Sequence, residues 1–532
     1  MLAEKSGAAG RNLSVYHARG SGTCGAHPAD KRSQMFQAVG GVLCLVLGGF
    51  LALYPTRRYA EHRYVVDAAA CRMELLMVSR ADLAADPDTG AVVLFHGIAA
   101  NRIIMLYLAR AFAELGLRVF VPDLPGHGRS PGPFTPASAE SCSASLLRGL
   151  AARGMLLPNR TILAGHSMGA AIALRVAGKF RPAGVIAISP APMRAGHGVA
   201  SENLLFHTLP LLTPNTLVMV GQFEPAGLKE NAADLARSPT GSVVFLEIPR
   251  NTHVSMLFSP AVAREAQEWA ARVLSLPDHP RLPSRAFLLA CLLGIIGLLL
   301  IGGPFLREML GNKGNEDFES TEPVPVIRGV LEVALFSVVA VEILRHVPPL
   351  RVLRLFQGDY LASFFLVVGL GLILLHGTAA RNGFRAQPRV FLGAAVAALL
   401  LHFLLTGWFE LTATGAWLNF ARWARFPLFA VSAFLYLYGI EIVAGPVVDG
   451  YRRYAFWFLL LTLAWLPLVF GVLYFGTGEF LPVLLSPFFV LQALLAGLGI
   501  QLVRRQSGAA PVAALFGAIL LAGFCLVLFP LS

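Results

Sequence analysis

The sequence predicts an α/β domain with a doubly wound, mostly parallel sheet, joined to an all-α polytopic transmembrane domain. Two observations predict this combination. Of the 532 residues, 56% are hydrophobic and only 14% are charged, whereas a soluble chain usually carries about 25% charged residues. The hydrophobicity is also uneven, because residues 55–280 mix polar and apolar segments while residues 286–530 consist mostly of long apolar runs.

Short apolar runs alternate with amphipathic segments in the first of these blocks, for which we predict domain limits of 60–278. Such alternation of strand and helix builds a mostly parallel sheet with helices on both faces. Ligands bind such sheets at the carboxyl ends of the strands. The expected strands are 73–79, 91–95, 118–122, 161–164, 184–189, 216–221 and 242–248, and the expected helices are 102–115, 137–153, 168–179 and 260–274.

Residues 35–54 form the first apolar run that reaches the length of about 20 residues needed to cross a bilayer. A polar leader, residues 1–34, precedes this run, and Arg57 and Arg58 follow it instead of a small-residue cleavage site. A cleaved signal peptide usually has a shorter leader and a shorter apolar core. We therefore expect an uncleaved transmembrane signal-anchor, with processing as the alternative.

Residues 284–532 are expected to form a membrane domain of about eight further transmembrane helices. The stretch 411–445 is the least clear, because residues 417–425 could form an interfacial helix ahead of a span. The apolar runs lie near 286–305, 326–345, 359–377, 389–408, 426–445, 454–475, 480–502 and 511–530.

The formal net charge of +12 usually reflects, in a membrane protein, Arg and Lys in loops that face the cytoplasm. We find no dense Lys/Arg stripe and expect no nucleic-acid partner. We expect a multi-pass protein of a bacterial inner membrane, and the short-loop charges favour the α/β domain on the outer side. The basic residues then expected inside are Lys31, Arg32, Arg381, Arg385, Arg389, Arg452, Arg453, Arg504 and Arg505, whereas Arg57, Arg58, Arg345, Arg351, Arg354, Arg422 and Arg425 weigh against this orientation.

The six cysteines are scattered, without a CxxC motif or a Cys/His cluster of zinc spacing. We therefore expect no metal, and no organic cofactor either. Cys71 and Cys142 could pair if the α/β domain lies outside the cytoplasm, since disulfides persist in oxidising compartments.

A Gly-x-Ser-x-Gly motif, from Gly165 to Gly169, follows the apolar run 161–164 and opens an Ala-rich helical segment. This setting is typical of a serine held on a tight strand-to-helix turn, where flanking glycines let strand and helix approach closely. Ser167 is thus the candidate nucleophile, and the backbone N–H of Met168 is a candidate oxyanion donor. His166 is expected to support the motif.

The same pattern occurs a second time, from Gly128 to Gly132. Pro131 follows the serine there, and proline has no backbone N–H to donate to an oxyanion. Ser130 also lacks a strand directly before it and a helical pattern after it. We therefore predict no catalytic role for Ser130.

His96-Gly97-Ile98 follows the apolar run 91–95. Gly97 permits a turn that aims the N–H of Ile98 at the site as the second oxyanion donor, and His96 is expected to be structural. Each such donor contributes about 10²–10³-fold in rate by stabilising a tetrahedral intermediate.

Three motifs occur in a fixed order: the strand that ends at His96-Gly97, the segment from Asp123 to Ser130, and the turn around Ser167. This order resembles the α/β-hydrolase superfamily over residues 70–275. The resemblance implies a sheet of the eight-stranded type, a catalytic order of Ser, acid and His, and hydrolysis of ester, thioester or related acyl bonds. The resemblance does not extend to the membrane block.

The acid is expected after the strand 216–221, where Glu224 stands in place of the Asp that most members of the superfamily carry. Glu is accepted in this role, and Asp234 is the alternative. The base is expected after the strand 242–248, where His253 precedes the closing helix. His253 would take the proton of Ser167 and return it to the leaving group, while Glu224 holds its tautomer.

These motifs predict a membrane-anchored serine esterase, lipase or thioesterase that cleaves an acyl ester or a lipid-like substrate at the bilayer. The short connection 190–215 predicts a minimal lid with one helix at 202–209. Acyl transfer to another acceptor and an inactive binding module are alternatives. A transporter or flippase-like membrane block is a further one, because ionisable residues mark transport sites in many spans; those in or near the spans are Glu332, Glu342, His376, His402, Glu410 and Glu441.

Overall fold

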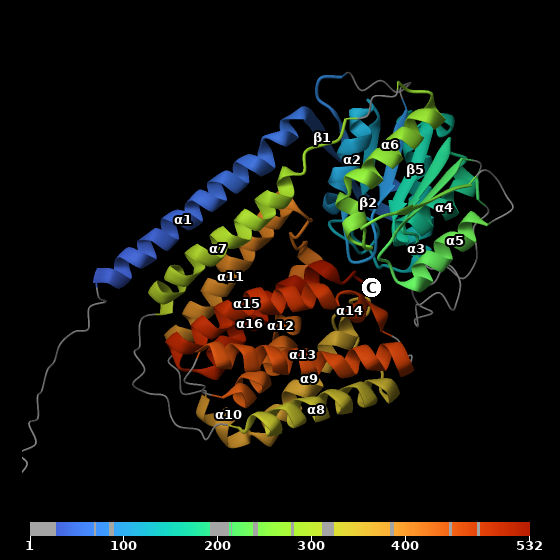
Figure 1. The fold of residues 1–532 in the computed structure, drawn as a ribbon. Coiled ribbons are helices and arrows are strands. Elements are labelled where there is room, and N and C mark those ends of the chain that lie inside the picture. The colour runs from blue at the N-terminus through green and yellow to red at the C-terminus, as the bar shows by residue number, and fades with distance from the viewer. Residues whose placement is uncertain are drawn as a thin grey trace, which may run out of the picture.

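The structure, a computed structural model, contains a helix-covered sheet beside a body of long helices (Figure 1). The expected polar leader up to residue 27 and the expected lid helix at 202–209 lie outside the described residues. We call the elements from β1 to α6 the sheet domain and those from α7 to α16 the helical domain. The described residues are 28–68, 71–83, 90–191, 212–213, 215–237, 243–277, 281–310, 324–383, 388–445, 450–475 and 479–532.

Eight strands form one sheet in the order β1-β2-β4-β3-β5-β6-β7-β8. β2 runs antiparallel to both β1 and β4, and all other neighbours are parallel. This confirms the doubly wound, mostly parallel α/β sheet. The strands are β1 (Tyr59–Ala68), β2 (Cys71–Arg80), β3 (Ala91–Phe95), β4 (Arg118–Pro122), β5 (Thr161–His166), β6 (Gly184–Ile188), β7 (Thr216–Gly221) and β8 (Val243–Ile248).

Helices cover both faces of this sheet. α2 and α6 share one apolar core with it, and α3, α4 and α5 share a second core on the opposite face. The strands from β3 to β7 are buried on both faces, which explains why their sequences are continuously apolar. The helices are α2 (Leu106–Glu114), after the 3-10 turn Arg102–Met105, α3 (Pro136–Ala152), α4 (Met168–Phe180), α5 (Ala226–Ala236) and α6 (Pro260–Leu274).

A disulfide joins Cys71 of β2 to Cys142 of α3, with a Cα–Cα distance of 5.4 Å. This is the pairing that the sequence allows for a domain outside the cytoplasm. The bond ties the antiparallel edge of the sheet to a helix that follows β4.

The remaining helices are long and apolar. In the part of the chain that the structure describes, eight helices have the length and composition to cross a membrane, one near the N-terminus and seven in the helical domain. These are α1 (Pro28–Leu53), α7 (Ala286–Leu310), α9 (Gly358–Leu375), α11 (Pro388–Thr412), α12 (Phe420–Ala444), α13 (Gly450–Phe475), α15 (Ser486–Ser507) and α16 (Ala510–Leu528); α8 (Val326–His346), α10 (Gly377–Gly383) and α14 (Phe480–Leu484) complete the helical domain.

Two expectations about the spans change. α8 is a helix at an expected span, but it is not among the eight, because Arg328, Glu332 and Glu342 interrupt its apolar sequence. α12 begins at Phe420 and continues through Pro427, so the alternative of a separate interfacial helix at 417–425 is wrong.

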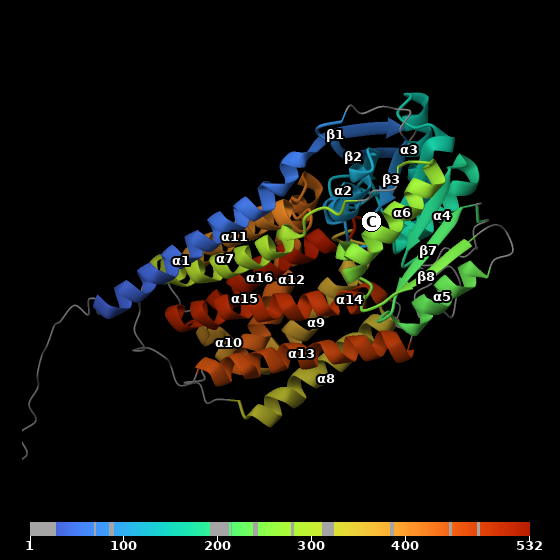
Figure 2. The same cartoon turned by 45° about the horizontal axis from the view of Figure 1, so that its top comes forward.

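α1 and α7 run side by side, and the sheet domain lies between them in the chain (Figures 1 and 2). A Cβ atom on Gly41 of α1 would lie 2.8 Å from the carbonyl oxygen of Gly297 of α7. Small residues at such crossings let membrane helices pack closely. The two ends of the sheet domain therefore arise from one packed helix pair.

Candidate active site

Ser167 lies between β5 and α4 in a turn of strained backbone. Its φ of 55° and ψ of −118° are unusual for a residue other than glycine, and such strain persists only where the surroundings hold it. The Ser167 N–H donates to the carbonyl of Ile188 at 2.9 Å, and the Ser167 carbonyl accepts from Ala170 and Ala171. β6 and α4 thus fix the turn from both sides.

Gly165 and Gly169 lie where β5, α4 and β3 meet. A Cβ atom on Gly165 would lie 2.3 Å from the carbonyl carbon of Gly169, and one on Gly169 would lie 2.3 Å from the carbonyl oxygen of Phe95. Both clashes are with backbone atoms, which cannot rotate away as a side chain can. The two glycines therefore set the height of Ser167 above the sheet.

Met168 is the first residue of α4. The first N–H groups of a helix have no partner within the helix, and the role of this N–H as an oxyanion donor stays a prediction.

Gly97 brings the turn after β3 against Ser167. A Cβ atom on Gly97 would lie 3.3 Å from the Ser167 Cβ. The next two residues, Ile98 and Ala99, follow this close approach, and Ala99 has a positive φ of 57°. We call residues 96–101 the oxyanion loop, because Ile98 is the second expected oxyanion donor.

His96 holds the start of this loop. The Leu124 N–H donates to His96 Nε2 at 3.0 Å, so the ring proton is on Nδ1, which donates to the Gly97 carbonyl at 2.7 Å. Burial lowers the pKa of His96, which keeps the ring neutral in this arrangement. The structural role expected for His96 agrees with these contacts.

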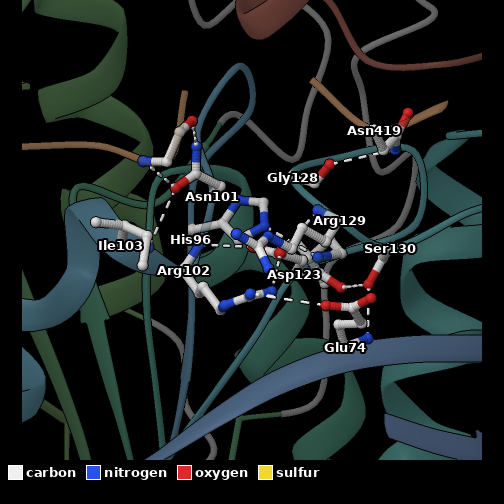
Figure 3. Close-up of polar contacts among 12 residues, drawn as sticks. Glu74, His96, Asn101, Arg102, Ile103, Asp123, Gly128, Arg129, Ser130 and Asn419 are labelled. Atoms are coloured by element: carbon white, nitrogen blue, oxygen red, sulfur yellow. Dashed lines mark hydrogen bonds and ion pairs between the residues drawn. The ribbon is translucent and has the colours of Figure 1, made fainter. Parts of the chain in front are cut away.

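Ser130 is completely buried behind this loop. Its hydroxyl donates to the Asp123 carbonyl at 2.7 Å and accepts from the Glu74 N–H at 2.9 Å (Figure 3). The side chain therefore joins the end of β4 to β2. These two hydrogen bonds account for a serine at position 130, so no catalytic role is needed to explain it.

Glu224 and His253 lie in contact at the ends of β7 and β8. His253 Nδ1 is 3.1 Å from Glu224 Oε2. The second carboxylate oxygen, Oε1, accepts from the Gly221 N–H at 3.1 Å and from the Ser189 hydroxyl. With the carboxylate accepting, Nδ1 carries the proton, and Nε2 of His253 remains a free base.

The Glu224 carboxylate stays ionised in this site. Its burial raises the pKa, but the hydrogen bond from His253, the positive charge of that ring when it is protonated, and the bonds from Ser189 and Gly221 outweigh burial and lower the pKa of Glu224 below its ordinary value. Asp234, the alternative acid, pairs with Arg237 on α5. The contact with His253 therefore favours Glu224.

His166 connects the serine turn to the base. Its Nε2 donates to the His253 carbonyl at 2.9 Å, and the two rings lie 4.7 Å apart. Burial and the neighbouring His253 lower the pKa of His166 to about 3. The residue that precedes Ser167 in the chain thus contacts His253, although no hydrogen bond among the described residues joins the Ser167 hydroxyl to His253.

Sequence reasoning missed Ser189 as a partner of Glu224. Ser189 follows β6 directly, and its φ of 48° turns the chain at the carboxyl edge of the sheet. A polar residue directly after a buried strand is the signal that could have identified it.

The ionisable residues of the helical domain are largely paired. Glu441 contacts Arg453 and Arg504, and Glu332 contacts Arg328 and His376. Mutual pairing accounts for these charges without a transported ion. Across the described ranges, no group of three or more His, Cys, Asp or Glu side chains could hold a metal ion.

Comparisons with known proteins agree with this geometry. Residues 92–323 match the sequence model of the Alpha/beta hydrolase family. Esterase YjfP of Escherichia coli (strain K12) is 28% identical over 148 residues, which is 26% of this chain and 57% of that protein, so the chain spans little more than half the length of this curated relative.

Solved structures also resemble part of the chain. An alpha-beta serine hydrolase homologue from Coxiella burnetii is 19% identical, with a TM-score of 0.33, and covers 40% of this chain and 97% of its own. An a/b serine hydrolase without lid from Xanthomonas campestris is 19% identical, with a TM-score of 0.32, and covers 41% of this chain and 97% of its own.

Proposed function

The chain carries a domain of the α/β-hydrolase superfamily, and from that premise we propose that the protein is a membrane-anchored serine hydrolase. Its substrate would be a carboxylic ester or thioester of a lipid-like or acylated molecule. Ser167 is the nucleophile, His253 the base and Glu224 the acid of this proposal, and Ile98 and Met168 donate to the oxyanion. The contact of Glu224 with His253, beside a serine held in strained backbone, is the observation that carries it.

The proposed reaction proceeds in two acyl-transfer steps. Ser167 Oγ attacks the substrate carbonyl while His253 Nε2 accepts its proton, and the negative charge on the former carbonyl oxygen meets the two N–H donors. The bond to the leaving alkoxide or thiolate then breaks, and the leaving group takes the proton from His253. A water molecule attacks the acyl-enzyme by the same route, which releases the acid and restores Ser167.

Apolar side chains next to the acid and the base support a lipid-like substrate. Phe223 precedes Glu224 in the chain and is 62% exposed, and Val254 follows His253 in the chain and is 37% exposed. Exposed apolar groups at the edge of a site favour an apolar ligand. The tethers α1 and α7 would keep this edge near the bilayer.

A series of acyl esters tests this substrate class. We expect kcat/KM for p-nitrophenyl esters to rise at least about tenfold from acetyl to octanoyl, because each fully buried methylene contributes about 0.8 kcal/mol. The measurement uses the full-length protein in nanodiscs, with active sites counted by a fluorophosphonate. A flat or falling series would contradict the lipid-like substrate, and equal fluorophosphonate labelling of wild type and Ser167→Ala would contradict the serine hydrolase itself.

We also propose that the sheet domain lies outside the cytoplasm. The Cys71–Cys142 disulfide supports this, since such bonds persist in oxidising compartments. Several basic residues that weigh against this side are engaged in contacts: Arg58 pairs with Glu114, Arg422 donates to the Gly126 and Phe529 carbonyls, and Arg425 donates to the Leu353 carbonyl. Arginines held in this way are weaker topology signals than free loop charges.

Labelling from one side tests this orientation. We expect a membrane-impermeant fluorophosphonate to label wild type in intact bacterial spheroplasts as fully as after lysis, because the site would face the probe. Ser167→Ala is the control for labelling elsewhere. Labelling that requires lysis would place the sheet domain in the cytoplasm.

A further inference from the structure

The catalytic edge of the sheet domain rests on the helical domain. Ile98 and Ala99 of the oxyanion loop pack, partly buried, against the apolar core of the long helices. Gly126, after β4, accepts hydrogen bonds from Arg422 of α12 and from the Leu531 N–H. The loops that build the site are therefore also the loops that meet the helical domain.

Asn101 carries the polar part of this contact at the end of the oxyanion loop. It is only 3% exposed. Its Nδ2 donates to the Gly415 carbonyl at 2.7 Å and to Thr414 Oγ1 at 3.3 Å, and its Oδ1 accepts from the Gly415 N–H at 2.9 Å. Oδ1 also accepts from the Ile103 N–H at 3.1 Å. The side-chain amide of Asn101 thus joins the backbone of Gly415 to the 3-10 turn that follows the oxyanion loop.

The partner segment is itself held in place. The N–H groups of Ala413 and Thr414 donate to the Phe409 carbonyl at the end of α11. The Ala416 N–H donates to Glu410 Oε2 at 3.0 Å. Residues 413–416, which we call the clamp segment, are therefore fixed to α11 and present a rigid surface to Asn101.

Gly415 leaves no room for a side chain at this contact. A Cβ atom there would lie 2.7 Å from Asn101 Oδ1 and 3.0 Å from its Cγ. Asn101 cannot retreat easily, because the same oxygen accepts from Ile103. The shortest bonds of this contact thus join Asn101 to Gly415, and either residue can be changed independently.

We propose that the clamp segment of the helical domain positions the Ile98 N–H as an oxyanion donor, acting through Asn101. The proposal rests on the proposed serine hydrolase. His96 fixes the start of the oxyanion loop from within the sheet domain, and Asn101 fixes its end from the helical domain. The helical domain is then part of the catalytic apparatus as well as an anchor. Asn101 is a positioning residue, since it acts through Ile98.

Loss of the contact between Asn101 and Gly415 should lower kcat more than it weakens substrate binding. One oxyanion donor contributes about 10²–10³-fold to kcat, and a misplacement of about 1 Å can cost about 10²-fold. We therefore expect a 10- to 100-fold fall in kcat for Asn101→Ala and for Gly415→Ala, with KM changed less than about threefold. Since both substitutions break the same contact, we expect kcat of the double variant to be no lower than kcat of the more affected single variant.

The experiment uses the full chain in nanodiscs, with active sites counted by fluorophosphonate so that misfolded protein does not enter kcat. A second readout is the inhibition constant of an alkylboronic acid, whose tetrahedral adduct on Ser167 places a negative oxygen between the two donors. We expect this constant to rise by the same factor as kcat falls. Asn101→Asp keeps the size and the acceptor but repels the Gly415 carbonyl, and serves where the alanine variants fold poorly. Asn419→Asp is the matched control, because it removes the interdomain hydrogen bond to the Gly128 carbonyl at 3.4 Å, keeps the acceptor that caps α12, and does not involve the clamp segment.

The outcomes separate the two proposals. If wild type hydrolyses esters and Ser167→Ala does not, while Asn101→Ala, Asn101→Asp and Gly415→Ala keep the wild-type kcat and boronate affinity, only the positioning proposal is overturned. The same holds if Gly415→Ala alone is unaffected, or if Asn419→Asp lowers kcat equally. If wild type neither labels at Ser167 nor hydrolyses esters, the proposed function is overturned, and the positioning proposal that rests on it is overturned with it.

Discussion

Replacing Ser167 with alanine is expected to lower kcat/KM for ester hydrolysis by about 10⁴–10⁶-fold, because no other group can form the acyl-enzyme. The strained turn between β5 and α4 is held by Ile188 and by the first turn of α4, and alanine fits it as well as serine does. The fold should therefore survive, and the unfolding temperature should remain close to that of wild type. Rates with p-nitrophenyl butyrate and fluorophosphonate labelling measure the effect.

Ser130→Ala is the control for this variant, since Ser130 occupies the second Gly-x-Ser-x-Gly motif. Its hydroxyl bonds to Asp123 and Glu74 inside the sheet domain, so its loss should lower the free energy of unfolding by about 1–3 kcal/mol. Turnover per labelled site should stay within about threefold of wild type. Loss of labelling in Ser130→Ala with full labelling in Ser167→Ala would reverse the assignment.

Removing the base is expected to have an effect of similar size. His253→Ala should lower kcat/KM by about 10⁴–10⁶-fold, and Glu224→Gln by about 10⁴-fold, because the amide no longer favours the tautomer with a free Nε2. Asp234→Asn is the matched control, since Asp234 pairs with Arg237 on α5 and should leave turnover unchanged. Equal losses in Asp234→Asn and Glu224→Gln would refute the choice of acid.

The pH profile of wild type gives a further test of the base. Burial lowers the pKa of His96, His127 and His166, the last to about 3. A lowered histidine pKa means that the ring is neutral at every pH above it, so the His166 ring does not titrate between pH 5 and 9. Glu224, whose pKa is also lowered, is ionised throughout this range. We therefore expect the acid limb of log kcat/KM above pH 5 to have unit slope, with no contribution from His166 or Glu224; a slope of two would show that another group titrates.

The sheet could be predicted from the sequence because its central strands are buried on both faces. Continuous apolar runs such as Ala91–Phe95 have no other place in a soluble domain, and the structure confirms all seven expected strands with shifts of one or two residues at their ends. β1 was missed because it lies at the edge of the sheet, where its side chains are mostly exposed and its sequence is mixed. α5 was also missed, because its buried face is short and includes a polar residue: Asn231, Ala232 and Leu235 are its buried residues.

Much of the candidate site was also predictable, since chain order places motifs at one edge of a parallel sheet. Glu224 and His253 follow strands that are neighbours, and the structure brings them into contact. The support around them was not predictable. This support consists of Ser189, the His166 contact with the His253 carbonyl, and the Asn101 contact with Gly415. These contacts depend on side-chain directions or on segments far apart in the chain, and a periodic sequence pattern predicts neither.

The pairing of α1 with α7 changes how strong the contact between the two domains has to be. Two free proteins pay about 4–15 kcal/mol in lost translational and rotational freedom when they associate, and contacts such as Arg129 with Glu410 or Asn419 with Gly128, each at 3.4 Å, are too weak to offset that. Here both ends of the sheet domain emerge from a packed helix pair, so docking is intramolecular, with an effective concentration on the order of millimolar. Weak contacts are therefore enough to keep the sheet domain docked on the helical domain. We expect a substitution at the interface to change the fraction of time that the sheet domain is docked, while α1 and α7 keep it attached.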